Sequence, residues 1–416
     1  MLGFESYPSD LGHPASTGIN LNLVHSELAT IFDPLLFTPG PLTTSATVKQ
    51  AMLHDAGSWH VDFNERVRWV RNELLSIAEL SPVDGWEAIL LQGSGTNGVE
   101  AVFATSVPQT GKVCVVTNGA YGERMIRMLQ HLRIDHAVLR SPENELPDLL
   151  RLEELLSADP AITHVAAVHC ETTTGILNPL AEIGAITRRH VCLLVVDAMS
   201  SFGGIPIDFA SAGADFIISS PNKCLEGVPG FCFVLARRES LLANAACAWV
   251  LSLDLADQLH GFERNGQFRF TPPTHALLAF VQALKEFHQE GGVNVRHRRY
   301  QTNHEILKAG MRRLGFQPYL PPKLQSCIIT AFFCPADERF QFTDFYRRLA
   351  DKGFLIYPGK LTHAETFRIA NIGHLFAADI EALLAAVSAV RDEMGFNPLG
   401  GVPHLTAPVA AFPTHS

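Results

Sequence analysis

Val191-Cys-Leu-Leu-Val-Val-Asp197 is the stretch of sequence from which the fold can be inferred. Five of the six residues before the aspartate are large and apolar, which is typical of a strand buried on both faces of a parallel sheet. A second apolar stretch, Ala214–Ser220, predicts another strand and leads into Lys223 in the run SSPNKCLEGVPG. Because α/β sheets bind ligands at the carboxyl ends of their strands, we expect Asp197 and Lys223 to meet at that edge.

Each of these two residues also has an ordinary structural interpretation. Lys223 could end its strand and extend its amine to water, and Asp197 could cap a helix or pair with a nearby arginine. The spacing of 26 residues (223 − 197) favours a site, because it leaves room for one crossover and one strand. A lysine amine that is partly desolvated at such an edge can act as a nucleophile.

A glycine-rich run, Gly93-Ser-Gly-Thr-Asn-Gly98, lies between a predicted strand at Ala88–Gln92 and a predicted helix at Val99–Ser106. Such a turn presents free backbone N–H groups to an anion. The run also matches the dinucleotide fingerprint G-x-G-x-x-G, so a hydride-transfer dehydrogenase is an alternative. However, the next predicted strand, Lys112–Thr117, runs into Asn-Gly-Ala-Tyr121 without the acid that would hold a ribose. The run therefore predicts a phosphate cradle for a cofactor without adenosine.

An amine, a carboxylate and a phosphate cradle at one sheet edge are the groups that pyridoxal 5′-phosphate requires. Lys223 would form the Schiff base, Asp197 would pair with the ring nitrogen, and the cradle would bind the phosphate. Tyr121 follows a strand and could lay its ring on the pyridine, although an ordinary half-buried tyrosine is an equal alternative.

Seven motifs extend this picture over the range from about Leu35 to about Phe396. In order, they are TPGPLTTS (Thr38–Ser45), GSGTNGVEAV, TNGAYGER, HCETTTGILNPL (His169–Leu180), SSPNKCLEGVPGF, RFTPPTH (Arg269–His275) and FRIANIGHL (Phe367–Leu375). Together they resemble the 2-aminoethylphosphonate–pyruvate transaminase family, in the class V branch of fold-type I pyridoxal-phosphate enzymes. One departure is Ala370, where the family's wording usually has glycine.

The resemblance implies a role for each matching residue in cofactor binding. Lys223 would carry the cofactor, and Asp197 would keep its pyridine nitrogen protonated. Ser94, Gly95 and Thr96 would bind the phosphate. The resemblance also places the rigid Thr-Pro-Gly-Pro turn near the active site.

Further roles follow from the same resemblance. Tyr121 would stack on the cofactor ring, Thr172 would lie near the ring hydroxyl, and Asn222 would stand beside the lysine. Thr271 would reach the phosphate of the partner subunit's cofactor, which implies a homodimer with shared active sites. Arg368 would bind the anionic group of the substrate. From the residues alone, Arg368 could equally form a structural ion pair, and Thr271 could cap the helix that follows it.

The implied reaction moves the amino group of 2-aminoethylphosphonate to pyruvate and gives phosphonoacetaldehyde and L-alanine in two ping-pong halves. An alanine–glyoxylate or serine type of class V aminotransferase remains an alternative. A cysteine desulfurase is disfavoured, because Cys327 lies in a strand-like run and Asn222 stands where a histidine is usual. A non-catalytic protein on this scaffold is disfavoured by the complete set of lysine, aspartate and cradle.

The predicted fold class is α/β, with a large domain around a mostly parallel, doubly wound sheet and a smaller α/β C-terminal domain. The predicted boundaries are a loose arm over residues 1–31, the large cofactor domain over 32–292, the small domain over 293–396 and a mobile tail over 397–416. Periodicity predicts further helices at Glu65–Leu80, Thr274–Glu290, Thr343–Lys352 and Ala377–Met394, and strands at Cys327–Phe333, Phe354–Tyr357 and Phe367–Ile372.

Composition predicts a cytoplasmic enzyme. The 32 Lys and Arg residues against 42 Asp and Glu give a net charge of −10, which disfavours a nucleic-acid surface. No apolar run reaches the ~20 residues of a membrane span. The first basic residue is Lys49, which fits neither a secretory signal nor a mitochondrial presequence. The eight cysteines, including Cys224 beside Lys223, show no metal-binding spacing and are interpreted as reduced, packed residues.

Overall fold

The computed structural model describes residues 33–244, 248–361 and 364–398 of the 416-residue chain. The predicted arm, and all but two residues of the predicted tail, lie outside these ranges. Contacts divide the chain into Met1–Pro34 and Leu35–Ser416, and the helices and strands of the described residues belong to the second unit.

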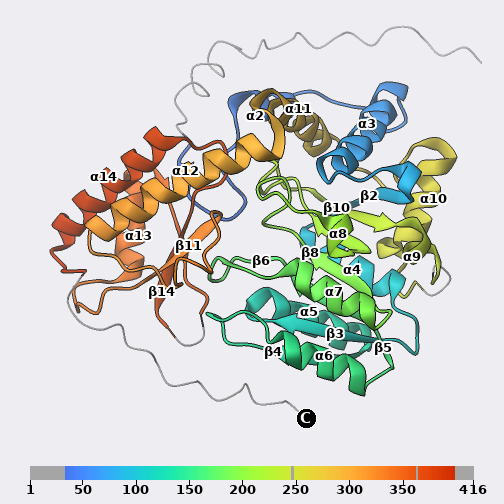
Figure 1. The fold of residues 1–416 in the computed structure, drawn as a ribbon. Coiled ribbons are helices and arrows are strands. Elements are labelled where there is room, and N and C mark those ends of the chain that lie inside the picture. The colour runs from blue at the N-terminus through green and yellow to red at the C-terminus, as the bar shows by residue number, and fades with distance from the viewer. Residues whose placement is uncertain (1–32, 245–247, 362–363, 399–416) are drawn as a thin grey trace, which may run out of the picture. The chain divides into compact units, whose positions relative to one another are not determined.

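The fold is organised around a seven-stranded sheet in which Asp197 ends the middle strand (Figure 1). Every neighbouring pair runs parallel except those of one strand, β10, which is antiparallel to β2 and β9. This confirms the predicted mostly parallel α/β sheet. The strand order is β2 (Trp86–Gln92), β10 (Phe231–Arg237), β9 (Phe216–Ser219), β8 (Leu193–Asp197), β5 (Ile162–Val168), β3 (Lys112–Thr117), β4 (Asp135–Arg140).

Helices and a large apolar core surround this sheet. The core includes buried residues from Val48 to Phe287, and the helices α4, α5 and α7 pack against the strands. No helix in the described ranges has the length and apolar character that crossing a membrane requires. The helices of this part are α2 (Ala46–Ala51), α3 (Val61–Ile77), α4 (Gly95–Ser106), α5 (Ala120–Leu132), α6 (Leu149–Ala158), α7 (Leu180–Arg189), α8 (Phe209–Ala212), α9 (Arg238–Leu242), α10 (Leu255–Asn265) and α11 (Thr274–Glu290).

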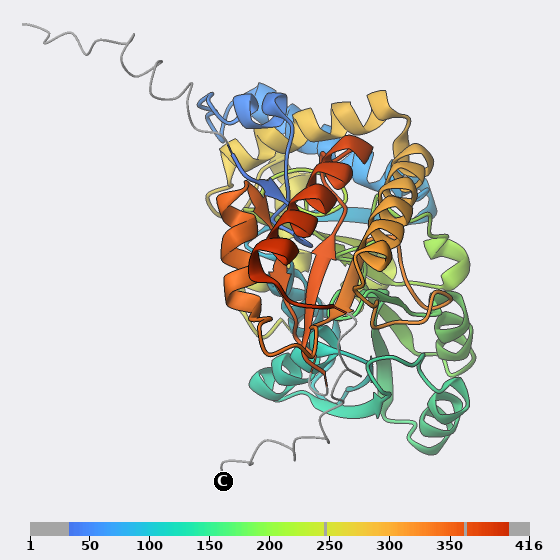
Figure 2. The ribbon, with the colours of Figure 1, turned by 90° about the vertical axis from the view of Figure 1, so that its left-hand side faces the viewer.

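The C-terminal part has a sheet and an apolar core of its own, which run up to Phe396. Figures 1 and 2 show its helices, in orange and red, gathered around the strands β11 and β14. Phe37, which the predicted boundaries assign to the large domain, packs in this second core. The division at residue 292 stays a prediction. The elements are an antiparallel sheet in the order β11 (Ile329–Phe333), β14 (Thr366–Ala370), β13 (Tyr357–Pro358), a parallel pair of β1 (Leu35–Leu36) and β12 (Phe354–Leu355), and the helices α12 (Gly292–Arg313), α13 (Phe342–Asp351) and α14 (Ala377–Met394).

Two element boundaries differ from the prediction in a way that affects the site. The strand expected from Val191 begins at Leu193, because Val191 adopts a left-handed φ of 56° and is 92% exposed. The helix expected from Val99 begins at Gly95, so the glycine-rich run forms its first turn. By contrast, Thr274–Glu290 matches the prediction, since Gly291 ends that helix with a φ of 110°.

Candidate active site

Asp197 and Lys223 follow neighbouring parallel strands and line the same cavity. Asp197 ends β8 and pairs with Ile218 of β9. After β9 the chain turns through Pro221 and Asn222 to Lys223. The cavity has a volume of about 370 Å³ and lies at the carboxyl edge of the sheet, where the sequence placed it.

Lys223 is held by the turn that carries the TPGP motif. Its Nζ donates to the carbonyl oxygen of Pro39 at 2.8 Å and lies 3.4 Å from that of Gly40. Gly40 has a φ of 115°, and a Cβ at this position would lie 2.7 Å from Nζ, so the approach requires glycine. Burial lowers the pKa of Lys223 to about 8, so part of the amine is neutral near pH 7.

Asp197 is a buried carboxylic acid, with only 6% of the residue exposed. The backbone N–H of Met199 donates to its Oδ1 at 2.9 Å. Burial raises the pKa of Asp197 to about 6, although the Met199 N–H and the charges of Lys223 and Arg124 oppose this effect. Asp197 is therefore mostly ionised at neutral pH, and it can pair with a cation that enters the cavity.

The first turn of α4 forms an anion cradle. Ser94 donates its hydroxyl and its backbone N–H to Asn97 Oδ1, at 3.0 and 2.8 Å. Among the described residues, no acceptor engages the backbone N–H groups of Gly95 and Thr96, which point along the start of the helix dipole. A Cβ on Gly95 would lie 2.1 Å from Met199 Cε, so a larger residue would displace the side chain that borders the cradle.

Tyr121 begins α5, and a buried acid holds it in place. Glu171 accepts from the backbone N–H of Tyr121 at 3.1 Å and from the Thr173 hydroxyl at 2.6 Å. Arg124 lies over the Tyr121 ring, with Cζ 4.8 Å from its centre, and its Nη1 lies 3.3 Å from Thr96 Oγ1. This arrangement explains the HCETTTG motif, because its glutamate orients the aromatic ring beside the cradle.

Arg368 lies on β14 and is 1% exposed. Its Nε donates to the carbonyl oxygen of Pro358 at 3.0 Å, and its Nη1 donates to that of Thr172 at 2.7 Å. Arg368 takes part in none of the ion pairs in the described ranges. The structural ion pair that was the alternative role for Arg368 is therefore not found there. Burial lowers the pKa of Arg368 from its ordinary value of 12.5.

A further cation near Tyr121 was not foreseen from the sequence. Lys360 Nζ lies 6.0 Å from the centre of the Tyr121 ring. Among the described residues, no acid lies within ion-pair distance of Lys360. Burial and the charges of Arg368 and Arg124 lower its pKa. Three cations, Arg124, Arg368 and Lys360, therefore lie in one region with no carboxylate within ion-pair distance in the described chain, although the buried Glu171 acts on Arg368 and Lys360 through its charge.

The cavity brings together most of the predicted site residues and leaves out three. Thr172 and Arg368 contact each other, and neither is among the residues that line the cavity. Thr271 is exposed, and its carbonyl oxygen accepts from Gln92 Nε2 at 2.9 Å, one residue before the cradle. The predicted residues that line the cavity are Ser94, Gly95, Thr96, Tyr121, Asp197, Asn222 and Lys223.

Sequence reasoning missed several lining residues, among them Arg124, Met125, Met128, Met199 and Pro229. Arg124 lies in the TNGAYGER motif, so its charge three residues after Tyr121 was a usable signal. The methionines carried no such signal, because a methionine in a helical pattern is usually a packed core residue.

Comparison with known proteins agrees with this geometry. The family model described as "Aminotransferase class-V" matches residues 54–360. The chain belongs to the class V aminotransferase family. This aminotransferase is 52% identical over 355 residues to a 2-aminoethylphosphonate–pyruvate transaminase of Klebsiella pneumoniae, across 85% of the chain and 96% of that relative. The predicted family resemblance is thereby confirmed.

Solved structures place the aminotransferase in the same fold. A pyridoxamine–pyruvate aminotransferase from Mesorhizobium loti superposes with a TM-score of 0.80 at 23% identity, over 88% of this chain and 96% of that one. An alanine–glyoxylate aminotransferase from Nostoc sp. gives 0.79 at 24% identity, over 86% and 96%. Membership of the class V family also rules out the dehydrogenase alternative.

Cys224, next to Lys223 in the chain, and Cys327 are not reactive thiols. Burial raises the pKa of Cys327 to about 12 and that of Cys224 well above its ordinary value. A thiol of this kind stays protonated and is a poor nucleophile. This disfavours the desulfurase alternative on chemical grounds.

Proposed function

We propose that this aminotransferase moves the amino group of 2-aminoethylphosphonate to pyruvate, which gives phosphonoacetaldehyde and L-alanine. The observation that carries the proposal is the convergence of Arg368, Lys360 and Arg124 beside Tyr121 with no acid within ion-pair distance among the described residues. A phosphonate carries up to two negative charges and a carboxylate carries one. Several cations therefore favour binding of a phosphonate over binding of a carboxylate. The 52% identity to a transaminase named for this substrate supports the same assignment.

The residues around the cavity fit pyridoxal 5′-phosphate. The free N–H groups of Gly95 and Thr96 would bind the phosphate, Asp197 would pair with the ring nitrogen, and Tyr121 would lie against the ring. Lys223 would hold the cofactor through its amine, with Asn222 beside it. When bound, the cofactor supplies an electron sink for the carbon that loses its proton.

Lys223 is suited to move that proton. Its pKa of about 8 lies near the working pH, so Nζ can accept a proton from the amine-bearing carbon and later return it. Pro39 and Gly40 hold Nζ by their carbonyl oxygens and keep it pointed toward the cavity. The amine donor, 2-aminoethylphosphonate, and the carbonyl acceptor, pyruvate, would both react at the same Lys223. Phosphonoacetaldehyde would therefore leave the site before pyruvate enters.

Donor profiling tests the proposed substrate. With pyruvate as acceptor, 2-aminoethylphosphonate should form alanine at least about 100-fold faster, by kcat/KM, than serine or the carboxylate analogue β-alanine, because two or more charge-assisted bonds distinguish it. Lys360→Gln should raise the KM for 2-aminoethylphosphonate about 10-fold, since one such bond is worth about 1.5–3 kcal/mol. The measurement is alanine formation in a coupled assay.

The alternative, an alanine–glyoxylate or serine type of activity, predicts a different profile. It would show serine or alanine as the better donor with glyoxylate as acceptor, and Lys360→Gln would leave those rates unchanged. A better rate with serine or alanine, or an unchanged KM for 2-aminoethylphosphonate in Lys360→Gln, would contradict the phosphonate assignment without affecting membership of the aminotransferase family.

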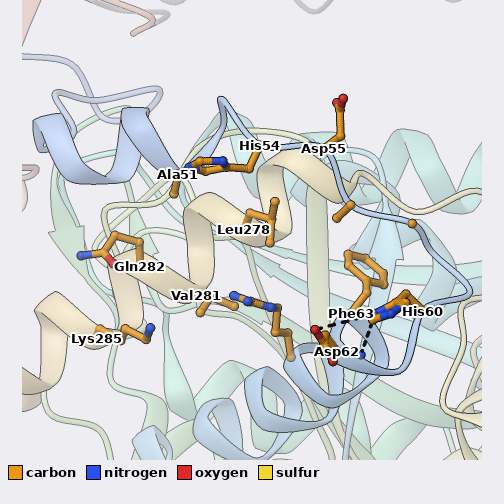
Figure 3. Close-up of a pocket in the computed structure, with 13 residues that line it drawn as sticks. Ala51, His54, Asp55, His60, Asp62, Phe63, Leu278, Val281, Gln282 and Lys285 are labelled. Carbon is orange, nitrogen blue, oxygen red and sulfur yellow. Dashed lines mark hydrogen bonds and ion pairs between the residues drawn. The ribbon is translucent and has the colours of Figure 1, made fainter.

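We also propose a homodimer in which Thr271 reaches the partner's cofactor phosphate. Leu53 and Trp59, between α2 and α3, are 81% and 80% exposed, and apolar residues this exposed favour an interface. Their neighbours in sequence, His54 and His60, line a cavity of about 400 Å³ between residues 51–66 and α11 (Figure 3). A second copy of the chain is the occupant proposed for this face, because the family resemblance assigns the exposed Thr271 to a partner's cofactor.

Sedimentation equilibrium tests the dimer. The mass should be twice the 45.5 kDa of one chain, and Leu53→Asp should shift the molecule toward a monomer by placing a charge in the interface. Leu150→Asp on α6 is the matched control, because Leu150 is 79% exposed and lies on a different helix. A wild-type monomer, or equal effects of both substitutions, would contradict the proposal.

A cytoplasmic location is part of the same proposal. All seven described cysteines are free thiols, and reduced cysteines are usual in the cytosol. A reducing environment would keep Cys224 unmodified next to Lys223.

A further inference from the structure

A buried cluster of charges lies behind the loop that carries Lys223. Its members, named here the Glu226 cluster, are Glu226, Glu290, Arg296, Arg299 and Tyr300. Glu226 is 5% exposed, Arg296 2% and Tyr300 not at all. Burying this many charged and polar groups has a large desolvation cost, which must be offset by well-formed bonds.

The members of the Glu226 cluster are hydrogen-bonded and ion-paired to one another at short distances. Glu226 Oε1 accepts from Tyr300 Oη at 2.6 Å and from Arg299 Nη2 at 2.7 Å. Arg296 Nη2 lies 2.6 Å from Glu290 Oε2 and 3.6 Å from Glu226 Oε2. Burial and the charge of Glu226 raise the pKa of Tyr300 well above its ordinary value of 10, so its hydroxyl stays a donor. Two acids against two arginines leave no surplus charge for an ion or substrate.

The cluster also binds the backbone at Lys223 and at the residue that follows it. The Glu226 N–H donates to the Lys223 carbonyl oxygen at 2.8 Å and closes a turn around the lysine. Arg296 Nη1 donates to the next carbonyl oxygen, that of Cys224, at 2.8 Å, and Tyr300 Oη lies 3.4 Å from it. Glu226 has a left-handed φ of 58°, which is unusual for a glutamate and costs of order 1 kcal/mol or more.

The same cluster grips the NIGHL segment that follows Arg368. Arg299 Nη1 donates to the carbonyl oxygens of Gly373 and Leu375 at 2.6 and 3.0 Å, and the Gly373 N–H lies 3.3 Å from Tyr300 Oη. Asn371 Nδ2 donates to the Tyr300 carbonyl oxygen at 3.1 Å. Two motifs that are 137 residues apart (367 − 230), NKCLEGVPG and FRIANIGHL, therefore meet at one set of side chains from α12.

We infer that Glu226 is a positioning residue, which fixes the Lys223 loop relative to the strand that carries Arg368. The described residues that line the cavity include no member of the Glu226 cluster. The cluster therefore acts through backbone carbonyl groups and not by touching substrate. A cluster needed for stability alone would not require a strained glutamate in the turn that holds the lysine. The inference rests on Lys223 as the working amine of the proposed function, but not on the identity of the amine donor.

Glu226→Gln is the main test, because it keeps the size of the side chain and removes the charge that Arg299 and Tyr300 hold. Tyr300→Phe is a second variant, which removes one hydroxyl from the same bonds. Glu87→Gln is the matched control: Glu87 also pairs with two arginines, Arg71 and Arg238, at the other end of β2 from the cradle. The titratable groups that face Glu226 are Arg296, Arg299 and Tyr300 of α12, Glu290 of α11, Cys224 of the loop, and His374 at 4.0 Å.

Three measurements separate positioning from stability. The first is the pH profile for labelling of Lys223 by an amine-reactive reagent in cofactor-free protein, followed by mass spectrometry. The second is the pH midpoint of the visible absorbance after loading with pyridoxal 5′-phosphate. The third is kcat. Glu226→Gln should shift both pH midpoints by about half a unit or more and lower kcat about 10- to 100-fold, since small displacements of a reacting group have effects of this size.

Tyr300→Phe should shift the same quantities in the same direction, and the double variant should lose less than the two single losses combined, because the residues act as a unit. Glu87→Gln should leave all three unchanged even where it lowers the urea midpoint. Unchanged pH profiles in both cluster variants, or equal shifts in Glu87→Gln, would overturn the inference. A wild-type protein that takes up no cofactor would contradict the proposed function, and the labelling profile would still decide the role of Glu226.

Discussion

Replacing Lys223 by alanine is expected to lower transamination by about 10⁴-fold or more, because the variant loses the amine that holds the cofactor and moves the proton. Lys223→Arg should be equally inactive, although it keeps a positive charge, because a guanidinium does not release its proton at working pH. The fold should persist in both, since Lys223 donates only to the carbonyl oxygens of the TPGP turn. Single-turnover kinetics and urea unfolding measure the two effects.

Two controls sharpen this result. Lys308→Ala removes a lysine that, in the described ranges, forms one ion pair, the i,i+3 pair with Glu305 on α12, and it should leave activity unchanged. Small primary amines in the buffer should restore part of the proton transfer in Lys223→Ala, but none in Lys223→Arg, where the side chain fills the space. Substantial turnover by Lys223→Ala without added amine would refute the assigned role.

Asp197→Asn is expected to lower kcat about 10²- to 10³-fold, the usual loss when one preorganised electrostatic partner is removed. The same change should stabilise the cofactor-free protein at pH 8. The pKa of Asp197 in the folded chain, about 6, lies above its ordinary value of 3.8. Folding therefore favours the protonated acid, so stability is fully present below pH 4 and is lost as the pH rises through 6.

The size of the stability effect follows from the same two values. They correspond to about 3 kcal/mol at pH 8, reduced by the new amide that has no partner. Urea midpoints of the cofactor-free variant and wild type at pH 8 and pH 4 measure it. The variant should be the more stable at pH 8, with the difference shrinking at pH 4. A difference that is the same at both pH values, or full activity, would contradict the role of Asp197.

The sequence predicted the sheet well because its strands are locally distinctive. Lys112–Thr117 and the apolar run before Asp197 are read by residue type and length alone. Val191 was wrongly assigned to the strand because it is an apolar residue in a polar turn. A hydrophobicity pattern does not reveal that its backbone is left-handed. The start of α4 was placed late because glycines suggest a loop, whereas here they coil into the helix that forms the cradle.

The chemical groups of the site were predictable, but the contacts between them were not. Asp197, Lys223 and the cradle each follow a strand, so the sheet-edge rule brings them together. Nothing in the sequence links Gly40 to Lys223, which lie 183 residues apart and meet through space. The same holds for Lys360, a lone lysine in an irregular stretch, whose importance comes only from its place beside Tyr121.

The antiparallel strand β10 fixes the spacing between two parts of the active site through its backbone. β10 begins at the carboxyl edge, where the Gly93 N–H donates to the Gly230 carbonyl oxygen at 3.1 Å and Phe231 pairs with Gln92. The separation between the cradle and the segment after Lys223 is thus set by backbone pairing and by the left-handed φ of Gly93 and Gly230, 117° and 146°. The other side chains of β2 and β10 can vary while this spacing is inherited, in keeping with a TM-score of 0.80 at only 23% identity to the pyridoxamine–pyruvate aminotransferase.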